Sequence, residues 1–233
     1  MDHESEDTQA LREALTRTRR ALIQTVHAVS LVVGLGDSYT ARHQEQVATL
    51  ALAVGRRLGL DEQRLEGLYL GALVHDVGKV AVPSVLLTKT ARLTPEEFAL
   101  IRTHVRVGID LLGHVSLPWP VQAIIGQHHE RLDGSGYPAG LSGEAIVTEA
   151  RITAVADVFE AMSEPRSYRA ALGKEVAMAE LERGCGITFD REAVGALRSL
   201  LKDAGAEDIW AYLKTDEFAS TVILPRQRAD PPA

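Results

Sequence analysis

Five histidines and two aspartates follow one another along the chain in an order that could hold metal ions. They are His43, the adjacent pair His75 and Asp76, His104, the adjacent pair His128 and His129, and Asp157. Imidazole nitrogens and carboxylate oxygens are ligands for transition-metal ions, and two such ions side by side form a hydrolytic centre. Near a helix end, two adjacent side chains can converge on one site, and a carboxylate has two oxygens with which to bridge two ions. These residues therefore point to metal-dependent hydrolysis.

The composition is that of an ordinary globular protein and excludes one broad class of function. The chain has 233 residues, of which 45% are hydrophobic and 24% are charged, enough for one substantial core or two small ones. Its formal net charge of −7 argues against direct DNA binding, which needs a basic surface. An anionic substrate would therefore need cations placed locally, and metal ions with a few arginines could supply them.

The sequence gives no sign of a membrane partner. No stretch approaches the roughly 18 apolar residues that a membrane-spanning helix needs. The first residues, Met-Asp-His-Glu-Ser-Glu-Asp, are acidic where a signal peptide would be basic. The only cysteine, Cys185, cannot form a disulfide within the chain. We therefore expect a cytoplasmic protein.

Most of the chain has the pattern of α-helices, and alternating strand patterns are scarce. Segments rich in Ala, Leu, Glu and Arg carry apolar residues three and four positions apart, which is typical of helices that bury one face. One helix start has strong local support, because Pro95 suits the first helical position and Glu97 can form a capping box with Thr94. We predict an all-α domain with helices near residues 9–33, 38–59, 62–77, 95–112, 119–129, 148–162, 174–184 and 191–204.

Two longer loops interrupt the predicted helices. One covers about residues 79–94 and follows His75 and Asp76, and the other covers about 130–147. The second loop carries four glycines before residue 144, together with Tyr137 and Pro138. Loops of that length inside a compact domain are more often functional than merely connecting.

The first predicted helix carries a separate pattern. Apolar residues and threonines alternate in steps of four and three, which is the seam of a coiled coil: Leu11, Leu15, Thr18, Leu22, Thr25, Val29 and Val32. This pattern favours a homodimer in which two such helices pair in parallel, and the alternative is an amphipathic helix packed on its own domain. We accordingly divide the chain into an N-terminal helix at 1–36, a catalytic domain at 37–215, and an extended or disordered tail at 216–233.

The residues around the candidate ligands resemble the HD-GYP family, a branch of the HD metal-dependent phosphohydrolases. Residues 73–79 are Leu-Val-His-Asp-Val-Gly-Lys, and residues 128–138 are His-His-Glu-Arg-Leu-Asp-Gly-Ser-Gly-Tyr-Pro, which is similar to the segment that names the family. Residues 37–43, Asp-Ser-Tyr-Thr-Ala-Arg-His, resemble the start of its first ligand helix. The resemblance extends from about Asp37 to Asp190 and implies an HD-type helical bundle with an N-terminal helical extension.

The resemblance also implies how the ligands are shared between two ions. Asp76 would bridge them, one ion would take His43, His75 and Asp157 in addition, and the other would take His104, His128 and His129. The nitrogen and oxygen ligand set suits iron or manganese. Some relatives bind a third ion through a glutamate four residues before the first ligand histidine. Tyr39 occupies that position here, so we expect two ions rather than three.

Further residues are assigned to the substrate by the same resemblance. Lys79 would contact the scissile phosphate and stabilise the developing charge, and Arg166 and Arg169 match the cationic pair that follows the last metal aspartate. Gly136 and Tyr137 would border the substrate pocket, and their loop could contact a diguanylate cyclase. Two positions depart from the family: Gln46 stands where many relatives have arginine, and Glu160 replaces a common aspartate.

The function implied by the resemblance is hydrolysis of cyclic di-GMP, with a hydroxide between the two metal ions attacking phosphorus in line. The product could be linear pGpG or GMP. Two alternatives remain open at this stage: an HD phosphohydrolase for another cyclic dinucleotide or nucleotide, and a signalling module that binds cyclic di-GMP without hydrolysing it. Turnover by purified, metal-loaded protein separates an enzyme from a binding module.

Overall fold

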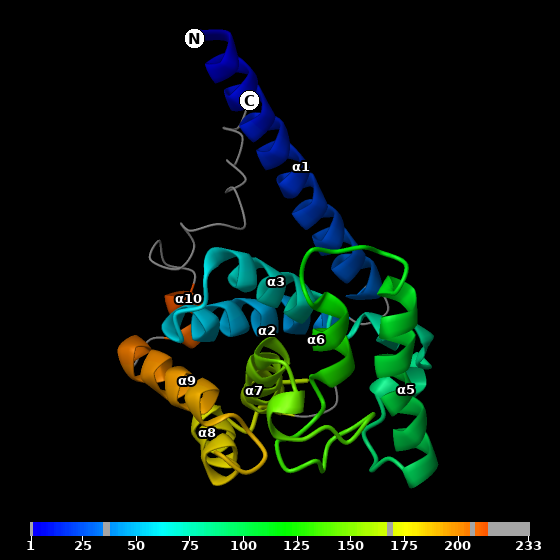
Figure 1. Cartoon of the computed structure of the whole chain (residues 1–233). Coiled ribbons are helices and arrows are strands. Elements are labelled where there is room, and N and C mark those ends of the chain that lie inside the picture. The colour runs from blue at the N-terminus through cyan, green and yellow to red at the C-terminus, as the bar shows by residue number, and fades with distance from the viewer. Residues whose placement is uncertain (1, 35–37, 167–169, 206–207, 214–233) are drawn as a thin grey trace, which may run out of the picture.

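The protein is a bundle of α-helices, and the prediction of an all-α fold is confirmed. The computed structural model describes residues 2–34, 38–166, 170–205 and 208–213, and for residues 2–6, 34 and 38–41 it describes the backbone alone. The α-helices in chain order are α1 (Asp2–Gly34), α2 (Ser38–Arg57), α3 (Glu62–Leu73), α4 (Ser84–Leu87), α5 (Pro95–Leu112), α6 (Val121–Gln127), α7 (Thr148–Ser163), α8 (Lys174–Arg183), α9 (Arg191–Ala204) and α10 (Ile209–Tyr212) (Figure 1).

Helices α2 and α7 lie against each other at the centre of the bundle. Helix α2 also packs on α3 and α9, and α7 packs on α6 and α8. The apolar residues of α2 recur at helical spacing, as in Val47, Leu50 and Val54, and all three are fully buried. Phe159 of α7 is also fully buried in the same core. The core therefore fixes the two central helices, which carry His43 and Asp157.

Helix α5 begins and ends where the sequence predicts. The Thr94 hydroxyl accepts a hydrogen bond from the Glu97 amide at 3.2 Å, and the Glu97 carboxylate accepts one from the Thr94 amide at 2.8 Å. This reciprocal capping box satisfies two amides that the helix itself cannot pair. Because the signal is local, the sequence alone locates this helix, which carries His104.

The helix predicted at 62–77 is too long. Helix α3 ends at Leu73, His75 and Asp76 lie in a turn, and a 3-10 helix, η1, covers Val77–Ala81. A carbon atom added at Gly78 would come within 1.9 Å of the main-chain oxygen of His104, so only glycine allows this approach of η1 to α5. The early end of α3 is therefore set by a tertiary contact, which brings Asp76 beside His104.

The two predicted loops contain short helices of their own. The loop predicted at 79–94 contains α4, and the loop predicted at 130–147 contains a 3-10 helix, η2, at Gly143–Ala145. The short helix α10 was also not predicted. The tail predicted at 216–233 lies outside the described residues, and the division of the chain into three segments stays a prediction.

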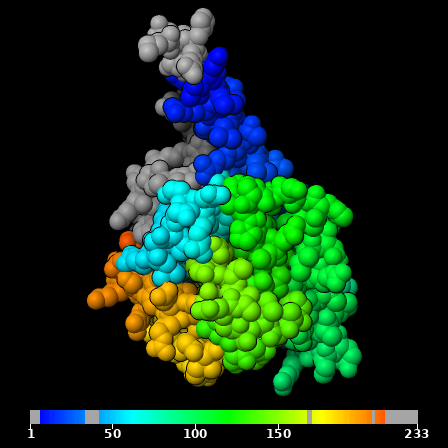
Figure 2. All heavy atoms as spheres, viewed as in Figure 1, coloured from blue at the N-terminus to red at the C-terminus, as the bar shows by residue number. Residues whose placement is uncertain are grey.

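Helix α1 projects from the bundle, as Figures 1 and 2 show. It packs on α2, α3 and η1 through a stripe that includes Ile23, which is 4% exposed, and Ser30, whose hydroxyl donates to Gln44 at 2.6 Å. The predicted coiled-coil seam lies elsewhere on the helix, and Leu11 and Leu15 are 71% and 67% exposed. The seam is therefore not the surface that holds α1 on its own domain.

Among the described helices, none is long and apolar enough to cross a lipid bilayer. The cytoplasmic location stays a prediction.

Candidate metal centre

The fold brings the seven candidate ligands together from five parts of the chain. His43 lies on α2, His104 on α5 and Asp157 on α7; His75 and Asp76 lie in the turn after α3, and His128 and His129 directly follow α6. Their ligand atoms form two groups, and within each group these atoms lie within 4.8 Å of one another. The Asp76 group consists of Asp76, His104, His128 and His129, and the His43 group consists of His43, His75 and Asp157.

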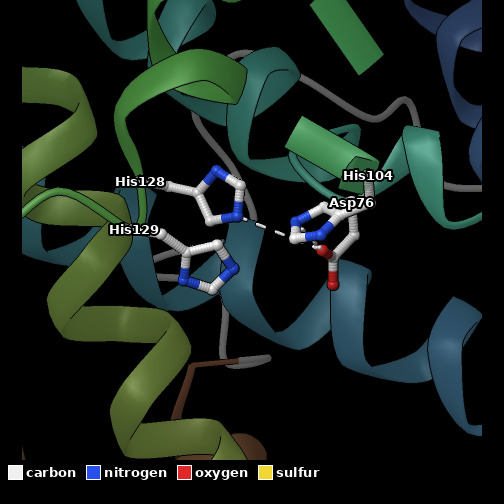
Figure 3. A group of neighbouring side chains, drawn as sticks. All are labelled: Asp76, His104, His128 and His129. Carbon is white, nitrogen blue, oxygen red and sulfur yellow. Dashed lines mark ion pairs between the residues drawn. The ribbon is translucent and has the colours of Figure 1, made fainter. Parts of the chain in front are cut away.

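Asp76 belongs to the first group but also faces the second, because each of its two carboxylate oxygens is directed toward the histidines of one group. Its Oδ1 lies 3.3 Å from Nε2 of His104 and 4.0 Å from Nε2 of His128, as the dashed lines in Figure 3 indicate. Its Oδ2 lies 3.3 Å from Nε2 of His75 and 3.7 Å from Nε2 of His43. This is the arrangement that a carboxylate needs to bridge two ions.

Three of the histidines are oriented by main-chain oxygens. Nδ1 of His75 lies 2.6 Å from the carbonyl oxygen of Ala72, and Nδ1 of His104 and of His128 each lie 2.8 Å from the carbonyl three residues earlier. A carbonyl only accepts hydrogen bonds, so Nδ1 carries the hydrogen and Nε2 keeps a lone pair.

Those lone pairs are buried and aimed into the site. Nε2 of His75, His104 and His128, and Oδ1 of Asp76, are buried without a hydrogen-bond partner among the described residues. Buried polar atoms without partners are costly, and metal binding is one way to satisfy them. The residues therefore fit a centre of two metal ions, while the donor set alone does not select the metal.

Burial keeps the histidines of the Asp76 group neutral. It lowers the pKa of His104 and of His128, and lowers the pKa of His129 to about 3. A neutral imidazole is the form that binds a metal ion. This group is therefore ready to bind a cation at neutral pH without releasing a proton from its histidines.

His43 has the opposite electrostatic environment. Burial opposes a charge on its ring, but the hydrogen bonds with Asp157 and Glu160 outweigh burial and raise its pKa to about 9. Its Nε2 lies 3.3 Å from Oδ1 of Asp157, and its Nδ1 contacts Oε2 of Glu160. Glu160 is fully buried. Glu160 thus places its carboxylate behind the first ligand histidine, a contact that the sequence did not predict.

Lys79 lies at the same centre. It belongs to the 3-10 helix η1, because α3 already ends at Leu73. Its Nζ donates to Oδ2 of Asp76 at 2.5 Å, and its side chain is 22% exposed. Burial raises the pKa of Asp76, but the positive charge of Lys79, together with the contact to His75, outweighs burial and holds that pKa well below its usual range. Asp76 is therefore ionised, with a cation that partly faces solvent beside it.

The loop with Gly136 and Tyr137 lies against the Asp76 group. A carbon atom added at Gly136 would come within 2.4 Å of Cα of Glu130, so glycine is required there. The buried Glu130 carboxylate holds the loop by accepting from the amides of Ala139 at 2.7 Å and Leu141 at 3.0 Å. The sequence did not predict this role of Glu130, although its place directly after His129 was the available signal.

Tyr137 contacts a candidate metal ligand. Its ring stacks on His129, with 4.6 Å between the ring centroids and 25° between the planes. The guanidinium carbon of Arg102 lies 4.3 Å from the centroid of the Tyr137 ring. Arg102 belongs to α5 and was not predicted as a site residue.

The remaining predicted positions are described less completely. Arg166 is half-buried, and Arg169 lies outside the described residues, as does the side chain of Tyr39. Gln46 is half-buried, and its Oε1 has no hydrogen-bond partner among the described residues. These observations leave the predicted substrate roles of the two arginines as proposals.

Comparison with known proteins defines the family. A family model described as the HD domain matches residues 15–193, which is more than half of the chain, so the protein belongs to the HD domain family. The Gly136-Tyr137-Pro138 segment and the related curated proteins place it in the HD-GYP branch. The matched region begins inside α1.

Relatives with curated descriptions include enzymes for two cyclic dinucleotides. The chain is 39% identical over 190 residues to the "Cyclic di-GMP phosphodiesterase response regulator RpfG" of Xanthomonas campestris, covering 81% of this chain and 49% of that protein. It is 34% identical over 176 residues to the "3'3'-cGAMP-specific phosphodiesterase 3" of Vibrio cholerae, covering 76% of this chain and 38% of that protein. The chain thus spans about half or less of the length of these relatives.

A solved structure has the same fold. Bd1817, described as an HDG"Y"P protein from Bdellovibrio bacteriovorus, matches with a TM-score of 0.60 and 26% sequence identity, covering 70% of this chain and 52% of that chain.

Proposed function

We propose that this chain is a metal-dependent phosphodiesterase that hydrolyses a cyclic dinucleotide, with cyclic di-GMP as the first candidate substrate. The observation that carries the proposal is the position of Asp76, whose two oxygens face two separate groups of histidine nitrogens. Two ions held there would supply positive charge for phosphate oxygens and lower the pKa of a water molecule. Iron and manganese suit the nitrogen and oxygen ligands best.

The chain's own residues would hold the substrate beside this centre. Lys79, which already contacts Asp76, would neutralise charge on the scissile phosphate. Arg166 and Arg169 would hold phosphate oxygens through their guanidinium groups, for which the planar fork is suited. Gly136 and Tyr137 would border the substrate, and the exposed Pro138 beside them leaves this loop accessible to a diguanylate cyclase partner.

A second candidate substrate is 3'3'-cGAMP. It is favoured by a specific observation, since several curated relatives are described as 3'3'-cGAMP-specific phosphodiesterases, one of them 40% identical over 147 residues. The metal ligands alone permit either substrate, because both contain the same type of phosphodiester.

The experiment that tests the proposal is hydrolysis by purified protein loaded with iron or manganese without oxygen. Cyclic di-GMP and 3'3'-cGAMP are supplied separately, and the products pGpG and GMP are separated by chromatography. We expect turnover of cyclic di-GMP, loss of turnover in Asp76→Asn, and normal turnover in Asp110→Asn, which changes an exposed aspartate paired with Arg106. Tight binding with no turnover of either nucleotide would instead establish a binding module and refute the proposal.

We also propose that two chains pair in parallel through the seam on α1. The support is the exposure of Leu11, Leu15 and Val32 on a helix that is held to its own bundle by other residues. The domain division into 1–36, 37–215 and 216–233 belongs to the same proposal.

A further inference from the structure

We propose that Tyr137 and Arg102 are positioning residues for the metal ligand His129, and that they control how tightly the Asp76 group binds its ion. The inference rests on the metal centre of the proposed function, but it does not depend on which nucleotide is the substrate. It starts from a difference between His129 and the other four candidate histidine ligands.

The other four histidines are each oriented through Nδ1. His75, His104 and His128 donate from Nδ1 to main-chain carbonyls, and Nδ1 of His43 contacts Glu160. Among the described residues, no hydrogen bond to either ring nitrogen of His129 is found. The torsion that turns an imidazole about its Cβ–Cγ bond has broad preferences, so a ring without such a bond needs another restraint to direct its nitrogen at an ion.

The restraint that the structure offers is the stack with Tyr137. The two rings are 4.6 Å apart and only 25° from parallel, so rotation of the imidazole would separate the faces in contact. Arg102 covers the tyrosine ring with its guanidinium, and Phe98 approaches it edge-on with 6.2 Å between centroids. Tyr137 is therefore packed between α5 and His129.

The loop backbone fixes the tyrosine in this place. The Tyr137 amide donates to the carbonyl oxygen of His129 at 3.2 Å, so the stacked residues are also joined through the main chain. Gly136 fits only because it has no side chain, and Glu130 anchors the residues that follow. The stack thus results from a loop held on both sides of Tyr137.

Arg102 would act through the tyrosine. A guanidinium over an aromatic face is attracted by the ring quadrupole, and this favours the ring position seen here. Arg102 is two residues before His104 on α5, so the same helix supplies one ligand of the Asp76 group and the restraint on another. Arg102 itself is exposed, and its replacement should not disturb the core.

Manganese(II) titration of metal-free protein tests the inference without any substrate. Calorimetry measures the two affinities, and electron paramagnetic resonance distinguishes a coupled pair of ions from a single ion. Aromatic contacts of this kind correspond to a change in affinity of about two- to tenfold. We expect Tyr137→Leu to weaken the binding of one ion by about that factor and to increase the single-ion signal, with the other affinity unchanged.

Three further variants separate positioning from general damage. Tyr137→Phe keeps the ring and should restore both affinities, and Arg102→Met should weaken the same ion as Tyr137→Leu, but less. Arg106→Met removes a cation one turn along α5 whose partner is Asp110, so it should bind manganese like the unchanged protein. Thermal unfolding confirms that each variant is folded.

The outcomes distinguish this inference from the proposed function. Equal affinities in Tyr137→Leu, Arg102→Met and the unchanged protein would overturn the positioning role. If the unchanged protein binds fewer than two manganese ions, the metal centre and the inference both fail. If two ions bind and Tyr137→Leu loses affinity as expected, the inference stands even when no cyclic dinucleotide is hydrolysed.

Discussion

Replacing Glu160 by glutamine would test whether the carboxylate behind His43 strengthens metal binding. The substitution keeps the size of a fully buried side chain and an oxygen that can accept from Nδ1 of His43, but removes the charge. A hydrogen bond to a charged group contributes about 1–1.5 kcal/mol more than a neutral one. We therefore expect the ion in the His43 group to bind about five- to tenfold more weakly at a pH where His43 is neutral.

The pH dependence of this loss has a definite sign. The pKa of His43 is about 9 in the metal-free protein, so below that pH an incoming ion must displace a proton. Glu160 stabilises both the metal-bound ring and the competing protonated ring. Its replacement therefore weakens the competitor too. The full loss of about five- to tenfold is reached only above pH 9, and the loss of affinity should be smaller near pH 7 than near pH 9, where about half of the His43 rings are neutral.

The assay is calorimetric titration of metal-free protein with manganese(II) under nitrogen at both pH values. Glu149→Gln is the matched control, because Glu149 is a buried glutamate of the same helix whose partner, Arg64 at 2.8 Å, lies on another helix outside the metal centre. Affinities in Glu160→Gln equal to those of the unchanged protein at both pH values would refute the reasoning.

Three further predictions follow from the site and from α1. Asp76→Ala should lose both ions and all phosphodiesterase activity, since the bridge is shared; metal analysis that finds two ions in this variant would contradict the bridging role. Lys79→Ala should keep both ions but lower kcat by roughly 10²-fold, the scale of a lost electrostatic donor; unchanged steady-state kinetics would exclude the assigned contact with phosphate. Leu11→Asp combined with Leu15→Asp should convert a dimer to a monomer in light scattering, because both side chains are exposed on the seam. A monomeric unchanged protein would end the dimer proposal.

Features that depend on neighbouring residues could be predicted from the sequence. The start of helix α5 was located because Thr94 and Glu97 are three residues apart and cap each other. The end of α3 could not be predicted, because it depends on the approach of Gly78 to the main chain of His104, 26 positions further along. A local pattern contains no information about that contact.

In the candidate site, too, the sequence predicts some features and only the structure shows the others. The histidines and aspartates could be picked out because their residue types and order are unusual, and the structure brings all seven together. The contacts behind them could not be found, because His43 and Glu160 are 117 positions apart and Arg102 is an ordinary surface arginine in the sequence. Only the folded chain shows which side chain lies behind which ligand.

The way the ligand histidines are oriented also determines how the centre can change during evolution. His75, His104 and His128 take their orientation from main-chain oxygens, which remain whichever side chain occupies positions 72, 101 and 125. His43 and His129 are oriented by side chains, so one nucleotide change can alter their surroundings without touching a ligand. The orientation of three ligands is thus insensitive to side-chain substitutions at the residues that orient them. The orientation of the other two, one in each group, depends on a side chain, so substitutions there can change the affinity of each ion in small steps.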